Sequence, residues 1–460
     1  MIKIHFCGGA EFVTGANYLI DTGTIKFIVE CGMIQGSREA DDMNYEPFPY
    51  NPAEVSFMIA THTHIDHIGR IPKLVKDGFS GEIYSTYPTK DFANISMQDT
   101  VSIMEHDYDK KPLYGRDDVT KSISQWRGRE YGEIYEIGKE VSFRFRDAGH
   151  ILGSAIVEMW ILDNDTGKRI KVVFSGDLGN HPSVLLKKYE LIKEADYVLI
   201  ESAYGDRTHE QVDVRKDIVR QAVKDVIERK SVLLVPTFSI ERTQDILYEL
   251  NDIMENHIDK YHKIDKKTKF DVYLDSPLAI KATKIYKKYI QYYNTEARNL
   301  SKVDQIFDFQ YLKFCESKDD SIAINTSPNP KMIMAGSGMS TGGRILYHEK
   351  KYLSDPKNIM LFVGYQGPHT LGRQILEGKE KVYIRGDYVE NKIEVRTVDG
   401  YSGHADQTML LEWISSIKTA KKVFVVQGES EAAHHLAPKI KPYLNLDAIV
   451  PTNNQVIELT

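Results

Sequence analysis

Cysteine is scarce in this chain, and no two cysteines are close together. Only Cys7, Cys31 and Cys315 occur in 460 residues. Disulfide-built secreted domains are dense in cysteine, and cysteine zinc sites use closely spaced pairs. The sequence therefore excludes a disulfide scaffold, makes a cysteine-based zinc site improbable, and predicts a reducing compartment.

The chain also lacks the features that direct a protein to a membrane. No run of about 18 apolar residues occurs, which excludes a transmembrane helix. The N-terminus, MIKIHFCGGAEFVTG, has no basic region ahead of a long apolar stretch, so it is not typical of a secretory signal. We expect a cytoplasmic protein.

An excess of positive charge is missing as well. Lys and Arg total 59 against 66 for Asp and Glu, so the formal net charge is −7. Because nucleic-acid-binding domains are commonly basic, any positive potential for such a ligand must be local. Residues 256–270 and 285–294 are rich in Lys and Tyr. A solvated helical surface is the favoured interpretation, and a surface for phosphate pairing and base stacking is the alternative.

Short apolar runs alternate with polar, periodic segments along the whole chain. Such alternation predicts an α/β architecture in which most strands are buried. The expected strands are 26–30, 55–61, 141–146, 171–175, 197–201, 231–236, 331–335, 358–363 and 422–426. The expected helices are 90–107, 212–230 and 242–254.

The strongest motif is THTHIDH at residues 61–67, directly after an apolar strand. In an extended chain alternate side chains share a face, so His62, His64 and Asp66 are expected to point the same way, with His67 at the following turn. Imidazole suits zinc, and a carboxylate completes or bridges such sites. The motif therefore predicts a metal site, and scattered core histidines are the alternative.

Two later residues are also candidate metal ligands, because each lies among glycines at the expected end of a strand. His150 lies in DAGHILGS and Asp177 lies in FSGDLG. Small neighbours allow the backbone to approach a bound ion or phosphate closely. Alone, Asp177 is typical of a turn, but the order of both residues after HxHxDH favours one shared metal site.

These motifs resemble those of the metallo-β-lactamase fold, and within it the β-CASP RNA-processing nucleases. The resemblance implies an α/β protein, a metallo-β-lactamase αββα sandwich with an inserted α/β β-CASP domain. It also implies two Zn²⁺ ions bridged by Asp177. The ligands that it implies for the two ions are His62, His64 and His150 for one, and Asp66 and His67 for the other.

The same resemblance assigns catalytic residues. Glu201 in ESAYGDR and His404 in YSGHADQ match two further family motifs. The resemblance implies that His404 is a general acid oriented by Glu201, and that Asp66 acts in catalysis as well as binding metal. A structural hydrogen bond between Glu201 and His404 is the alternative.

Two positions depart from the family pattern. Glu30 in VECG stands where the family has an Asp that orients the histidines. Gln427 in VVQGE stands where a His usually completes the second zinc site. An amide oxygen is a poorer zinc ligand than imidazole, so we expect a weakened second site or a water in place of the ligand. His434 and His435 could substitute, but a role on a helix surface is favoured.

Glycine, serine and threonine are concentrated in AGSGMSTGGR, residues 335–344, ahead of a helical pattern. A helix N-terminus with free N–H groups binds anions. A packed loop is the alternative, and the resemblance favours phosphate contact. The residues expected to contact substrate are Ser337, Gly338, Ser340, Thr341 and Arg344.

The motif order predicts a metallo-β-lactamase domain at 1–205, a β-CASP domain at 206–391, and a completing part with an RNA-specificity segment at 392–460. The length resembles that of compact prokaryotic relatives of the polyadenylation-factor endonuclease subunit, so we expect no added RNA-binding domain.

The predicted function is a zinc-dependent endonuclease that cleaves single-stranded RNA to 5′-phosphate and 3′-hydroxyl ends. A homodimer is implied by the resemblance alone. The alternatives are a hydrolase of DNA or a small phosphodiester, and a non-catalytic RNA-binding subunit because of Gln427.

Overall fold

The computed structural model describes residues 1–460 except 37, 107–109, 210–213, 257–268, 368 and 460. Most of the Lys- and Tyr-rich segment at 256–270 therefore lies outside the described residues. In the rest of the chain, no helix is both long enough and apolar enough to cross a bilayer.

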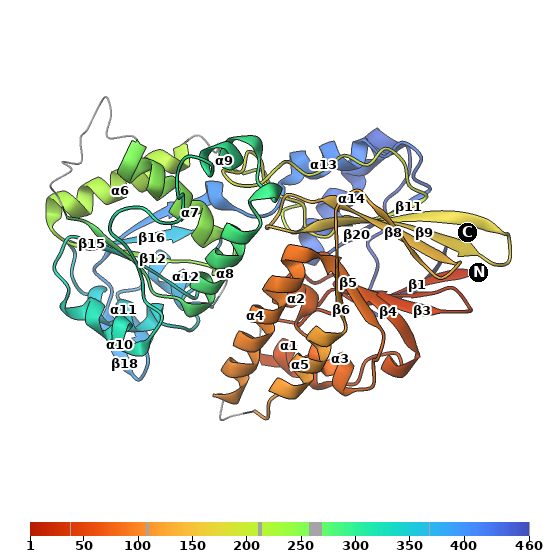
Figure 1. Ribbon diagram of the computed structural model, residues 1–460, viewed down its shortest axis with the longest axis horizontal. Coiled ribbons are helices and arrows are strands. Elements are labelled where there is room, and N and C mark those ends of the chain that lie inside the picture. Colours follow the sequence, from red (N-terminus) through yellow and green to blue (C-terminus); the bar gives the residue numbers. More distant parts are fainter. Residues whose placement is uncertain (37, 107–109, 210–213, 257–268, 368, 460) are drawn as a thin grey trace. The chain divides into compact units, whose positions relative to one another are not determined.

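The chain forms two compact units (Figure 1). The first contains Met1–His181, Lys187–Thr208 and His404–Thr460, and the second contains Pro182–Leu186 and His209–Gly403. The predicted division into domains at 1–205, 206–391 and 392–460 stays a prediction.

The first unit is built on two sheets. The seven-stranded sheet has the order β21-β1-β2-β3-β4-β5-β6, and the six-stranded sheet has the order β20-β11-β10-β9-β8-β7. The strands are β1 (Ile2–Gly8), β2 (Asn17–Asp21), β3 (Lys26–Val29), β4 (Val55–Ile59), β5 (Glu82–Thr86), β6 (Trp126–Arg129), β7 (Ile134–Ile137), β8 (Val141–Asp147), β9 (Ala155–Asp163), β10 (Lys168–Phe174), β11 (Tyr197–Glu201), β20 (Lys422–Val426) and β21 (Val456–Leu459).

Three apolar layers hold the first unit together. Side chains of both sheets, among them Phe57 and Phe174, form the central core. A second core lies between the seven-stranded sheet and its helices, and a third lies between the six-stranded sheet and its helices. The helices are α1 (Arg38–Asp42), α2 (Ile65–Ile68), α3 (Ile71–Lys76), α4 (Tyr87–Glu105), α5 (Arg116–Ser124), α13 (Gln407–Ser415) and α14 (Ser430–Leu444). This layering confirms the predicted αββα sandwich (Figure 1).

The strand pairing explains where functional side chains gather. β10, β11 and β20 are parallel neighbours, so their carboxyl ends meet at one edge of the six-stranded sheet. Every residue of β11 is buried, as expected for a strand that has parallel neighbours on both sides. Asp177, Glu201 and Gln427 follow or end these three strands and are thereby brought together.

The second unit contains a parallel six-stranded sheet and a small hairpin. The sheet has the order β14-β13-β15-β12-β16-β19, and β17 pairs with β18. Its strands are β12 (Val232–Pro236), β13 (Asp271–Leu274), β14 (Leu312–Phe314), β15 (Lys331–Ala335), β16 (Ile359–Val363), β17 (Lys381–Ile384), β18 (Asp387–Glu390) and β19 (Glu394–Val398). Its helices are α6 (Arg215–Arg229), α7 (Arg242–Asn251), α8 (Pro277–Lys288), α9 (Thr295–Leu300), α10 (Lys318–Ala323), α11 (Ile345–Tyr352) and α12 (Leu371–Leu376). The inserted α/β architecture is confirmed.

Candidate metal centre

The HxHxDH segment differs from its predicted shape. β4 ends at Ile59, and Asp66 and His67 lie on the short helix α2. The expectation of an extended chain through Asp66 is wrong, because the carbonyl of His64 accepts hydrogen bonds from the N–H groups of His67 (2.9 Å) and Ile68 (3.1 Å) and so starts a helical turn. Asp66 and His67 therefore do not continue the side-chain alternation of the strand.

Four donor atoms surround one point in the first unit. They belong to His62, His150 and Asp177, which are buried, and to His64, which is half-buried. His64 Nδ1 lies 3.1 Å from Nε2 of His62 and 3.1 Å from Nε2 of His150. Asp177 Oδ2 lies 3.3 Å from His62 Nε2 and 3.5 Å from His150 Nε2. A tetrahedron around an ion with bonds of about 2.0–2.1 Å has edges of about 3.3–3.4 Å, so this set fits a metal ion.

The protonation states of these four side chains also suit a metal. Burial lowers the pKa of His62 to about 4 and holds the pKa values of His64 and His150 well below the usual range. These rings are therefore neutral near pH 7, the form in which imidazole binds metal. Burial opposes ionisation of Asp177, but His67, His62 and His404 together outweigh it and hold the pKa of this carboxyl well below its usual range.

Sequence reasoning missed the role of Thr61 beside this cluster. The Thr61 hydroxyl lies 3.0 Å from Nδ1 of His62, and this contact fixes the ring so that Nε2 faces the cluster. The sequence offered no indication of the contact beyond the position of Thr61 in the motif.

A second donor set adjoins the first. His67 Nε2 lies 3.4 Å from Asp177 Oδ1 and 3.8 Å from Asp66 Oδ2. The fourth corner is the amide of Gln427, whose Nε2 lies 3.0 Å from His67 Nε2 and 3.4 Å from Asp177 Oδ1. An amide nitrogen has no lone pair for a metal, so this set does not provide a complete site as it stands.

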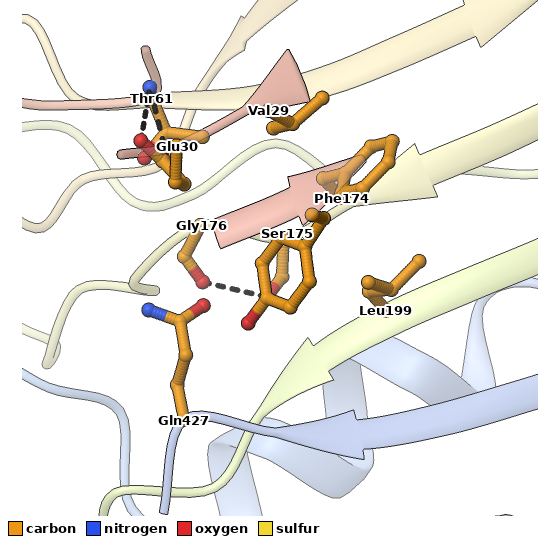
Figure 2. Close-up of a pocket in the computed structure, with 9 residues that line it drawn as sticks. Val29, Glu30, Thr61, Phe174, Ser175, Gly176, Leu199 and Gln427 are labelled. Atoms are coloured by element: carbon orange, nitrogen blue, oxygen red, sulfur yellow. Dashed lines mark hydrogen bonds between the residues drawn. The ribbon is translucent and has the colours of Figure 1, made fainter. Parts of the chain in front are cut away.

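Glu30 lies beneath the HxHxDH loop. It is buried, accepts a hydrogen bond from the N–H of Thr61 (3.2 Å), and lies 3.4 Å from His67 Nδ1. Glu30 also lines a small cavity with Ser175, Gly176 and Gln427. Figure 2 shows Gln427 reaching from its strand end toward Gly176, and the contact between Glu30 and Thr61 on the other side. Glu30 thus contacts both the loop and a ring of the second set.

His404 and Glu201 form a pair next to Asp177. Glu201 is fully buried, and one of its carboxylate oxygens lies 3.2 Å from His404 Nδ1. The other accepts a hydrogen bond of 2.6 Å from the N–H of Leu178. Burial opposes a charge on His404, but Glu201 and Asp177 outweigh it and raise the pKa of His404 to about 9. The imidazole is therefore protonated at neutral pH, with Nδ1 directed at Glu201.

His434 and His435 are exposed on α14, in agreement with the favoured interpretation. Within the described residues, neither belongs to a cluster that could hold a metal.

The expected substrate loop lies in the second unit, between β15 and α11. The hydroxyl of Ser337 accepts hydrogen bonds from the N–H groups of Thr341 (2.9 Å) and Gly342 (3.2 Å). The buried Ser340 donates to Glu349, and Phe238 packs against Gly338. Contact of this loop with RNA stays a prediction.

Arg344, the last residue of that loop, has internal partners. Its guanidinium donates to Asp275 Oδ1 (2.7 Å) and to the carbonyls of Cys315 (2.8 Å) and Glu316 (3.0 Å). The buried Asp275 also holds His348 Nε2 at 2.7 Å. Sequence reasoning missed this network, which fixes the start of α11.

The sandwich and its donor cluster at the strand ends define a metal-dependent hydrolase of the metallo-β-lactamase fold. A Beta-Casp domain model matches residues 243–375, and a model of a Zn-dependent metallo-hydrolase RNA specificity domain matches residues 388–451. A solved structure of a protein of unknown function from Enterococcus faecalis V583 aligns over both whole chains with a TM-score of 0.58 and 11% identity, which supports the fold alone.

Curated relatives narrow the assignment further. Ribonuclease TTHA0252 of Thermus thermophilus is 36% identical over 92% of each chain. An RNase J-like protein of Methanocaldococcus jannaschii is 30% identical over the whole of both chains. Transcription termination factor FttA of Methanosarcina mazei is 29% identical over all of this chain and 72% of its own length. The chain belongs to the β-CASP family of metallo-β-lactamase-fold nucleases.

Proposed function

We propose that this protein is a zinc-dependent endoribonuclease that cleaves single-stranded RNA to 5′-phosphate and 3′-hydroxyl ends. The observation that carries the proposal is the tetrahedral set of His62, His64, His150 and Asp177, with the protonated His404 beside it. The relatives named ribonuclease, and the match to an RNA specificity domain, support RNA as the substrate. A homodimer and a cytoplasmic location stay predictions.

The donor set favours zinc. Three neutral imidazoles and one carboxylate are typical zinc ligands, whereas hard ions such as Mg²⁺ prefer oxygen. Zinc bound there supplies Lewis acidity, because it brings the pKa of a coordinated water to about 7 and offsets negative charge on a phosphodiester.

Three side chains of the protein then accept, donate and orient the protons that the reaction needs. The Asp66 carboxylate is partly exposed, with 21% of its side-chain surface accessible, and is placed to accept a proton from attacking water. As the phosphorus–O3′ bond breaks, the protonated nitrogen of His404 that faces away from Glu201 donates its proton to O3′. Glu201 holds the ring in this orientation through Nδ1. The products are the 3′-hydroxyl and the 5′-phosphate.

Cleavage of a circular single-stranded RNA tests the proposal directly, because only an internal cut linearises a circle. We expect the zinc-loaded protein to cut circular and end-labelled linear RNA, and to cut DNA of the same sequence far more slowly. Extension of the products by poly(A) polymerase checks for the 3′-hydroxyl. Equal cleavage of DNA would instead favour the broader phosphodiesterase, and a zinc-loaded protein that cuts none of these substrates would overturn the proposal.

The variant His404→Gln tests the general acid. Loss of a positioned proton donor typically slows a reaction by about 10²- to 10⁴-fold, and we expect a loss of kcat in this range. The ion held by His62, His64, His150 and Asp177 should stay bound, since His404 is outside this set. Unchanged cleavage by a correctly folded, metal-loaded variant would show that His404 has only a structural role.

A further inference from the structure

The two donor sets of the centre differ in chemistry. The first offers three imidazole nitrogens and one carboxylate oxygen, from His62, His64, His150 and Asp177. The second offers one imidazole and two carboxylates, and its fourth corner is the amide of Gln427. Only the first set provides four metal-binding atoms as they stand, so the two positions cannot hold an ion equally.

The amide of Gln427 can satisfy His67 in either protonation state. A protonated ring donates to the amide oxygen after a half-turn of the amide, whereas a neutral ring accepts from the amide N–H. The Gln427 amide therefore forms a hydrogen bond of 3.0 Å with Nε2 of His67, the atom that would otherwise face an ion.

The position of Gln427 is fixed by its backbone. Gln427 has φ +50°, and its N–H donates to the carbonyl of Gly9 (2.8 Å). A Cβ on the following Gly428 would lie 2.6 Å from the carbonyl oxygen of Ser202, so the backbone here packs closely against the residue that follows β11. These backbone contacts hold Gln427 beside His67 and Asp177.

We propose that Gln427 makes the centre unequal, with one tightly held ion at His62, His64, His150 and Asp177 and a weak, exchangeable position at Asp66 and His67. An ion at the second position must break the hydrogen bond to His67 and accept a neutral amide oxygen in place of imidazole. Oxygen-rich sets suit harder ions, so replacing Gln427 with His should favour Zn²⁺ more than Mn²⁺. This inference rests on the proposed metal-dependent function and specifies how that site is loaded.

Metal content tests this inference without RNA. After dialysis against metal-free buffer, we expect elemental analysis to find about one zinc per wild-type chain and about two per Gln427→His chain. Loss of a hydrogen-bond partner of a metal ligand costs about 10- to 100-fold in affinity, so a gained ligand should tighten the second zinc by at least this factor. The exposed Glu429 provides a matched control, and Glu429→Gln should behave as wild type.

A second comparison keeps the inference testable if Gln427→His folds poorly. His67→Ala should keep the single zinc of the dialysed wild type, whereas His64→Ala should lose it. Two equally tight zinc ions in the dialysed wild type, or loss of the retained ion in His67→Ala, would overturn the inference. Because no activity is measured, a failed RNA assay and a failed metal count remain distinguishable.

Discussion

Replacement of Asp177 with Asn reduces RNA cleavage to the background of buffer alone and leaves the dialysed protein without stoichiometric metal. Asp177 belongs to both donor sets, through Oδ2 to His62 (3.3 Å) and through Oδ1 to His67 (3.4 Å). Its carboxylate brings negative charge to both metal positions. An amide oxygen in its place is neutral and is a poor ligand for zinc, so both positions weaken together.

The measurement combines elemental analysis with cleavage of end-labelled RNA. Asp117→Asn makes the same chemical change at an exposed position on α5 and should leave metal content and rate unchanged. Circular dichroism shows whether Asp177→Asn keeps its fold. A folded variant that holds as much zinc as the wild type, or cuts RNA within about tenfold of its rate, would contradict this role for the carboxylate.

The sequence predicted well those features that depend on local pattern. The apolar runs at 197–201 and 422–426 became the buried parallel strands β11 and β20. Parallel neighbours end at the same sheet edge, so residues placed after such strands gather there. The proximity of Glu201 and Gln427 to the HxHxDH segment follows from this rule, together with the resemblance to a known family.

Features that depend on hydrogen bonds to particular atoms were not predictable in the same way. Strand periodicity cannot reveal that the carbonyl of His64 starts a helical turn, so Asp66 was placed on the wrong element. Contact of Arg344 with substrate stays a prediction, which rests on the family resemblance and the helix start that it precedes. The partner of Arg344, Asp275, lies 69 residues away in sequence, and no local pattern reports such a pairing.

Close contacts between backbones are equally hidden in the sequence, and Gly179 shows how much depends on one of them. A Cβ at Gly179 would lie 1.8 Å from the carbonyl oxygen of Gly149 and 2.8 Å from the backbone nitrogen of His150. Real Cβ atoms essentially never come within 3.0 Å of such atoms. Gly179 also pairs with His404 in an isolated β-bridge, so its neighbours on both sides are functional.

Gly179→Ala should therefore destabilise the first unit by about 4 kcal/mol or more, which is exceptional for one methyl group. The backbone must move by more than 1 Å, because the contact at 1.8 Å has to open beyond 3.0 Å. That shift displaces His150 from the tetrahedral set, so any folded fraction should bind zinc weakly. Urea unfolding measures the first effect, and zinc titration measures the second.

Gly115→Ala is the matched control in the same unit, since a Cβ there would meet nothing closer than an oxygen of Asp118 at 3.9 Å. Gly115 caps α5, where alanine is less favourable than glycine, so a cost of about 1 kcal/mol or less is expected, with normal zinc binding. If Gly179→Ala were as stable as Gly115→Ala and bound zinc as tightly as wild type, the close approach of these loops would not be what holds His150 in place. Loss of stability with normal zinc affinity would separate the two roles, because it would show that the loop relaxes away from the metal ligands.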